Sequence, residues 1–95
     1  MTVYNVSDRE TISSLTASVG FTSAKLVAYL QYAVIQAIAG NVRFTVDGTT
    51  PTSSLGLRLL QDASVEIWGT TAMNKFRCID DGGTAKLEVV YMTRA

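Results

Sequence analysis

Very few side chains in this sequence could carry out catalysis or hold a metal ion. The 95 residues include no histidine and a single cysteine, Cys78. Histidine is the usual general base at neutral pH and the commonest metal ligand, so its absence excludes Cys–His nucleophile pairs and the ordinary zinc sites. A serine nucleophile would need a lysine base, and no lysine stands three residues after a serine. The sequence therefore predicts a protein that is not an enzyme and that binds no cofactor or metal.

The carboxylates allow one metal-binding hypothesis and a simpler alternative. Asp80 and Asp81 are adjacent, so on a strand their side chains would point to opposite faces. In a turn they could join Asp47 in a calcium site, because calcium prefers carboxylate oxygens. Aspartate is also a common turn residue whose carboxylate accepts backbone amide hydrogens. We favour the turn interpretation and expect Asp47 to accept hydrogen bonds from the amides of residues 48–50.

The remaining reactive or bulky polar side chains have structural explanations. Cys78 stands in an apolar run, which is typical of a small core residue rather than a reactive thiol. Arg43 and Arg77 are expected on solvated strand faces. Trp68 is the exception: pointing outward beside Glu66, its indole would need a partner to cover it. Burial of Trp68 under a second sheet is an equally good interpretation.

Composition is typical of a small globular domain with a largely neutral surface. Hydrophobic residues make up 47% of the chain and charged residues 17%, and 95 residues suffice for one core. The formal net charge is zero, and the scattered basic residues lack the basic stripe of a nucleic-acid-binding protein. The apolar stretch 26–39 is too short to cross a membrane and is interrupted by Gln31 and Gln36. Because the first residues do not resemble a signal peptide, we expect the chain to be made in the cytoplasm and left unprocessed.

The N-terminal residues 1–23 are predicted to form an irregular arm, followed by one domain over residues 24–95. Serine, threonine and aspartate dominate the arm, with isolated apolar residues between them. A short helix capped by Ser7 or Asp8 and a short strand over 15–19 both fit the spacing. Such an arm could dock onto a neighbouring subunit.

Residues 25–39 fit either a helix or a strand. They contain no glycine or proline, and Gly40 follows, as at a helix C-terminus. Residues 32–38 also fit a strand with two apolar faces, and the next segment, 42–46, alternates cleanly between apolar and polar residues. The connection 39–41 contains the glycine and asparagine that a hairpin loop requires. We therefore favour a strand over 32–38 that pairs with 42–46 in a hairpin.

Three further segments alternate in the same way, at 64–68, 75–80 and 84–92. The side chains expected to face inward are Val65, Ile67, Phe76, Cys78, Ala85, Leu87, Val89 and Tyr91. Residues 69–70 and 80–83 separate these segments, and the turn 47–52 closes the strand before them. Short strands at this spacing predict an all-β fold, a small antiparallel β-sandwich or a flattened barrel.

Four stretches of the chain form a recognisable series. They are 33–37 (AVIQA), 42–52 (VRFTVDGTTPT), 55–56 (LG) and 83–91 (GTAKLEVVY). The series resembles a family of small proteins from the structural-gene regions of tailed bacteriophages and prophages, with a VIQAEG-like strand, an R-x-DG-x-x-PT turn and an AKL-x-V-x-Y closing strand. The resemblance covers residues 24–92. Ala39 replaces an acidic residue often seen in the family, and residues 61–63 replace its Ala-Gly-acidic turn.

The resemblance implies a non-catalytic structural protein of the virion. Such a protein would be a capsid decoration (cement) subunit or a head-tail or tail accessory subunit. Its partners would be major capsid, portal, connector or tail proteins and further copies of itself. The candidate contact residues lie in the arm, on the strand 64–68 and in the turn, and are Val3, Tyr4, Ile12, Leu15, Asp47, Thr49, Thr50, Pro51 and Trp68. The alternative is a carbohydrate- or receptor-binding β-sandwich that uses Trp68, Tyr29 and Tyr91 as aromatic platforms.

Overall fold

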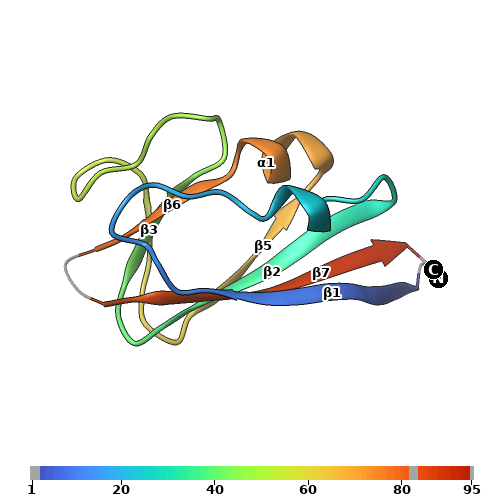
Figure 1. Ribbon diagram of the computed structural model, residues 1–95, viewed down its shortest axis with the longest axis horizontal. Coiled ribbons are helices and arrows are strands. Elements are labelled where there is room, and N and C mark those ends of the chain that lie inside the picture. The colour runs from blue at the N-terminus through green and yellow to red at the C-terminus, as the bar shows by residue number, and fades with distance from the viewer. Residues whose placement is uncertain (1–2, 82–83, 95) are drawn as a thin grey trace.

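The structure, a computed structural model, describes residues 3–81 and 84–94. Its elements, in chain order, are β1 (Tyr4–Ile12), the short 3-10 helix η1 (Ser23–Lys25), β2 (Leu30–Ile38), β3 (Val42–Thr45), β4 (Leu57–Leu59), β5 (Ser64–Trp68), α1 (Thr70–Lys75), β6 (Arg77–Asp80) and β7 (Lys86–Arg94). The strands form two antiparallel sheets, ordered β1-β7-β2-β5 and β4-β3-β6. The two sheets pack against each other, so the predicted all-β sandwich is confirmed (Figure 1).

The core lies between the two sheets and follows the alternation predicted from the sequence. Strand β2 buries Ala33, Ile35 and Ala37 completely, and β7 does the same with Leu87, Val89 and Tyr91. The smaller sheet contributes Val42, Phe44 and Cys78 to the same core. Because side chains on a strand alternate between its faces, each buried set is spaced by two residues. This result also settles the choice between helix and strand for residues 32–38, which lie in β2, in favour of a strand.

The expectation of an irregular N-terminal arm is wrong for residues 4–12. These residues form β1, which pairs with β7 along nearly its whole length, and the two strands run side by side in Figure 1. Ser7 and Asp8 do not cap a helix, because both lie within this strand, whose pairing register shifts between Val6 and Asp8. The sequence hides this strand because Asp8 and Glu10 occupy positions on its inward side, where an apolar residue would be expected.

The expected hairpin between residues 32–38 and 42–46 is also wrong. Strands β2 and β3 belong to different sheets, so the chain crosses the core after β2. The amide and carbonyl of Ala37 are already bonded to the carbonyl of Ala63 and the amide of Asp62. Ala39 and Gly40 have the positive φ expected of a loop, at 59° and 151°. The local geometry was thus predicted correctly, whereas the partner strand was not.

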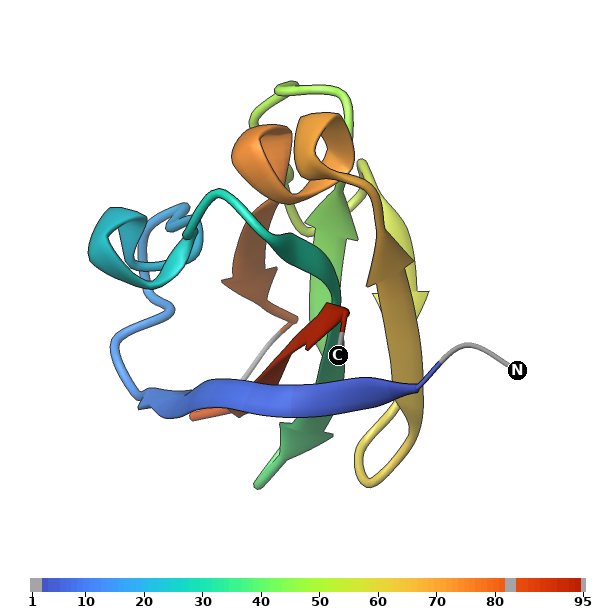
Figure 2. The same cartoon turned by 90° about the vertical axis from the view of Figure 1, so that its right-hand side faces the viewer.

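The segment between β5 and β6 contains an element that the alternation did not predict. Residues 70–75 form α1, although Thr70 was expected in a turn and Lys75 at the start of a strand. The helix covers one end of the sandwich and contacts β2 and β5 (Figure 2). The helix buries Met73, and the next residue after the helix, Phe76, is buried as predicted. Neither helix among the described residues is long and apolar enough to cross a membrane.

Candidate functional site

The best candidate site is the outer face of the four-stranded sheet, the side turned away from the core. Residue pairing places its side chains in three rows that cross all four strands from β1 to β5. The rows are Val6, Met92, Tyr32 and Trp68; Arg9, Val90, Val34 and Glu66; and Thr11, Glu88, Gln36 and Ser64. On β2, β5 and β7 these residues alternate with core residues, and all residues of the three rows are at least partly exposed. The first row is apolar or aromatic throughout, and the second has two valines between Arg9 and Glu66.

Three aromatic rings gather at one end of this outer face. Tyr32 stacks on Trp68, with ring centroids 4.1 Å apart and planes 18° from parallel. Tyr4 meets both rings edge-on, at centroid distances of 5.3 Å and 5.7 Å. Because β1 and β2 both pair with β7, the side chains of Tyr4 and Tyr32 meet across the C-terminal end of β7, where their partners are Arg94 and Met92. Offset and edge-to-face contacts of this kind stabilise the cluster beyond the area that they bury.

Trp68 therefore points outward, and the interpretation that buries it under the second sheet is wrong. Its side chain is 48% exposed, although its partners Tyr4 and Tyr32 cover part of it. The indole Nε1 donates a hydrogen bond of 3.1 Å to the Glu66 carboxylate. Val6, in the same row of the outer face, is 64% exposed. An aromatic and an aliphatic side chain thus stand in solvent in one row of the sheet.

The outer face also carries charged residues, which lie next to its apolar side chains. The Arg9 guanidinium lies 2.8 Å from the Glu88 carboxylate, which also accepts a hydrogen bond from the Thr11 hydroxyl. The Thr11 hydrogen bond, and secondly Arg9, lowers the pKa of Glu88. Glu66 makes no ion pair within the described chain. The outer face thus presents, at its β5 edge, a carboxylate that is hydrogen-bonded to the Trp68 indole but has no cationic partner among the described residues.

The other candidate residues of the arm lie apart from the aromatic cluster. Val3 precedes β1 and is exposed, whereas Ile12 packs against the core and is only partly exposed. Leu15 is 1% exposed, and its carbonyl accepts a hydrogen bond from the Asp80 amide. Leu15 is therefore a core residue and presents no surface to a partner, contrary to the prediction.

The turn 47–52 forms the beginning of the loop between β3 and β4. Asp47 accepts a 3.0 Å hydrogen bond from the Thr49 amide, as expected, and this bond lowers the pKa of Asp47. Asp47, Thr49 and Thr50 are exposed, whereas Pro51 is buried. Beside the turn runs an apolar groove of about 320 Å³, lined by Phe44, Thr45, Val46, Asp47, Thr49, Leu55, Gly56 and Leu57. Asp47 and Thr49 of the turn thus line one side of this groove.

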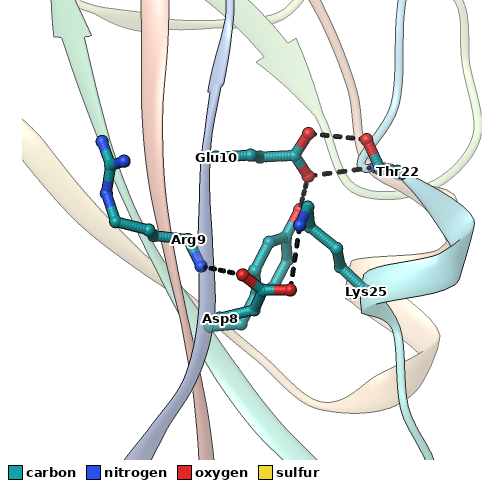
Figure 3. Close-up of polar contacts among 6 residues, drawn as sticks. Asp8, Arg9, Glu10, Thr22 and Lys25 are labelled. Carbon is teal, nitrogen blue, oxygen red and sulfur yellow. Dashed lines mark hydrogen bonds and ion pairs between the residues drawn. The ribbon is translucent and has the colours of Figure 1, made fainter.

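A polar cluster on the inward side of β1 holds a loop and leaves no free reactive group. Glu10 accepts hydrogen bonds from the Thr22 hydroxyl and amide, at 2.6 and 3.3 Å, and from the Tyr91 hydroxyl (Figure 3). Asp8 pairs with Lys25 at 2.9 Å, and this bond lowers the pKa of Asp8. Each carboxylate on the inward side of β1 is thus neutralised or hydrogen-bonded, which removes the cost of placing it beside the core.

The remaining candidates for chemistry are also used structurally. Asp81 pairs with Arg58 at 3.0 Å and Arg43 at 3.6 Å, and Arg77 bonds to the hydroxyl and carbonyl of Ser18. Arg43 and Arg77 are therefore partly buried and anchored, not solvated as predicted. Burial raises the pKa of the Cys78 thiol to about 12. Among residues 3–81 and 84–94, no group of three or more Asp, Glu, Cys or His could hold a metal ion.

Several residues of the outer face were not recognised as site residues from the sequence. Tyr32, Val34, Val90 and Met92 alternate with core residues, so β2 and β7 are apolar on both faces. An antiparallel strand with one face in water normally carries polar residues on that face. This departure was the available signal for an interface. Comparison of the chain with protein families, with curated proteins and with solved structures finds no match.

Proposed function

We propose that this protein is a non-catalytic assembly subunit of a tailed-phage particle, a capsid decoration or a head-tail or tail accessory protein. The observation that carries the proposal is the outer face of the four-stranded sheet, which exposes Val6 and Trp68 beside Tyr4 and Tyr32. The resemblance of residues 24–92 to phage structural proteins is the reason for proposing that the assembly is a phage particle. Adhesion through such a face requires no reactive group, in keeping with the composition of the chain.

The energetics of an apolar sheet face suit a subunit that is repeated many times. Each square ångström of apolar surface removed from water contributes about 25 cal/mol, so covering a few hundred square ångströms gives a useful contact. When the same contact recurs around a symmetric particle, weak individual contacts add up through multivalency. An uncovered apolar patch of this size on a solitary protein would instead promote aggregation.

Sugar binding, the alternative function, is supported less well by the same residues. Tyr91 is completely buried and cannot serve as an aromatic platform. Trp68 stacks one ring face on Tyr32 and meets the edge of Tyr4, so its aromatic surface is partly used within the chain. A glycan-array screen distinguishes the two functions: sugar binding that is lost in Trp68→Ala would favour the alternative.

Co-sedimentation with phage particles tests the proposed function. The particles should come from the phage or prophage that encodes this chain, with its gene deleted, and be mixed with purified protein. We expect the wild-type chain to sediment with the particles and the Val34→Lys variant, altered at the centre of the outer face, to stay in solution. Leu60→Lys places the same charge at an exposed leucine after β4 and should bind normally. Wild-type protein that remains in the supernatant would contradict the proposal.

A further inference from the structure

The middle row of the outer face has opposite charges at its two ends. Arg9 on β1 lies opposite Val90 on β7, and the row continues through Val34 on β2 to Glu66 on β5. Figure 3 shows Arg9 and Glu10 on opposite sides of β1. Glu10 points to the inward side, where it meets Thr22 and the hydroxyl of the core residue Tyr91. Arg9 and Glu66 therefore flank a valine pair on the outer face, about 14 Å apart at a spacing of about 4.8 Å per strand.

We propose that a second copy of this chain covers the outer face, with a twofold axis parallel to the strands between β7 and β2. This axis exchanges β1 with β5 and β7 with β2. It places Arg9 of each copy, which already contacts Glu88 of its own chain, over Glu66 of the other copy, so that two intermolecular ion pairs form. It also places Val90 over Val34. The inference rests on the proposed function in treating the outer face as an assembly interface, and it makes a second copy of the chain, rather than another virion protein, the partner that covers this face.

The other two rows match equally well about the same axis. In the apolar row, Val6 meets Trp68 of the other copy, and Met92 meets Tyr32. In the polar row, Thr11 meets Ser64 and Glu88 meets the neutral Gln36. No pair of like charges faces across the axis in any of the three rows, which is the condition for a self-complementary twofold interface.

A twofold axis perpendicular to the strands is disfavoured by the same charges. If that axis ran along the middle row, Arg9 would face Arg9 and Glu66 would face Glu66. Like charges opposed across an interface cost affinity, and the apolar row would face the polar one. Charge complementarity therefore selects one of the two ways in which the faces could meet.

The size of the face is consistent with a dimer of modest affinity. Four strands at about 4.8 Å, with residues 4–11 spanning about 26 Å at 3.3 Å per residue, give roughly 500 Å² for each copy. Two such faces reach roughly 1,000 Å², which is the lower limit for a specific interface. Aligned sheets pack about 10 Å apart with a relative rotation of about 30°, a gap that long arginine and glutamate side chains can span.

Charge reversal tests both the dimer and its axis. Sedimentation equilibrium of the purified chain should give a mass near twice 10.2 kDa at high micromolar concentration. Arg9→Glu and Glu66→Arg should each weaken dimerisation at least tenfold, and the double variant should recover to within about threefold of the wild type. Lys75→Glu, a charge reversal on α1, is the matched control and should not change the affinity.

Arg9→Glu also loses its contact with Glu88, so thermal unfolding of each variant must be measured alongside. Val34→Lys is a second test, because it changes an outward residue at the centre of the interface and should yield a folded monomer. A wild-type chain that stays monomeric would overturn the dimer, and a double variant as weak as the single ones would overturn the axis. A monomer that still sediments with phage particles would refute the dimer alone, whereas a dimer that does not sediment with them would refute the proposed function alone.

Discussion

The hydroxyl of Tyr91 donates a hydrogen bond to the carboxylate of Glu10, a residue 81 positions earlier in the chain. Tyr91 is completely buried in the central strand β7, and Glu10 lies on the neighbouring edge strand β1. Because Glu10 also accepts hydrogen bonds from Thr22, this one carboxylate connects the two strands and the loop that leads to η1. The contact explains how a polar edge strand can be held on an apolar sandwich.

We expect Tyr91→Phe to lower the free energy of unfolding by about 2 kcal/mol, since a hydrogen bond to a charged acceptor beside the core is lost. Urea denaturation followed by tryptophan fluorescence gives this value. Tyr29→Phe removes the same hydroxyl from a residue that is 77% exposed and should change stability by less than about 0.5 kcal/mol. Equal effects of the two substitutions would show that the Glu10 contact contributes nothing.

Alkaline pH should destabilise the fold, because two buried groups must lose their protons when the chain unfolds. Burial raises the pKa of the Cys78 thiol from 9.0 to about 12, and burial followed by the Glu10 hydrogen bond raises that of Tyr91 above 10.0. The unfolded chain releases these protons at lower pH than the folded chain does. Stability is therefore complete below about pH 9 and falls as the pH rises towards 12, by up to about 1.4 kcal/mol per pH unit for each group.

Urea denaturation at intervals between pH 8 and pH 11 measures this decline. The Tyr91→Phe, Cys78→Ala double variant lacks both groups and should show a clearly shallower slope, even though it starts from a lower stability. Identical slopes for the double variant and the wild type would assign the alkaline transition to other groups.

The Cys78 thiol should resist modification in the folded protein. It is completely buried, and with its raised pKa almost none of it is thiolate at pH 8. A disulfide reagent that releases a coloured thiol should react at least about 100-fold faster in 8 M urea, as set by access and thiolate fraction. Rapid labelling under native conditions would show that β6 opens from the sandwich on the timescale of the assay.

Two glycines of the β3–β4 loop should differ in their tolerance of alanine. Gly48 and Gly56 both have positive φ, at 88° and 122°, so alanine is strained at either position. An added Cβ at Gly48 would meet nothing within 4 Å, but at Gly56 it would lie 3.0 Å from the Phe44 carbonyl oxygen. We expect Gly48→Ala to cost about 1 kcal/mol and Gly56→Ala at least about 1 kcal/mol more, as measured by thermal or urea unfolding.

The faces of the strands could be predicted from the sequence because strand burial is encoded locally. Ile35, Leu87 and Val89 occupy alternate positions in short segments, and alternation alone assigns them to the core. The Asp47 turn was equally local, since its carboxylate bonds to an amide two residues away.

The tertiary structure decided which strands pair and which side chains meet. Strand β1 was hidden because Asp8 and Glu10 face inward, and only Lys25, Thr22 and Tyr91, brought close by folding, make that position acceptable. After β2 the chain passes from one sheet to the other. At this point the backbone of residues 62 and 63, and not that of β3, bonds to Ala37.

The outer face could not be assembled from the sequence for the same reason. Tyr4, Tyr32 and Trp68 come from three different strands. Their rings touch because the strand order β1-β7-β2-β5 places all three strands in one sheet. Periodicity states which way a side chain points, but strand order sets its neighbours. Strand order is determined by long-range pairing, which no local pattern of residues encodes.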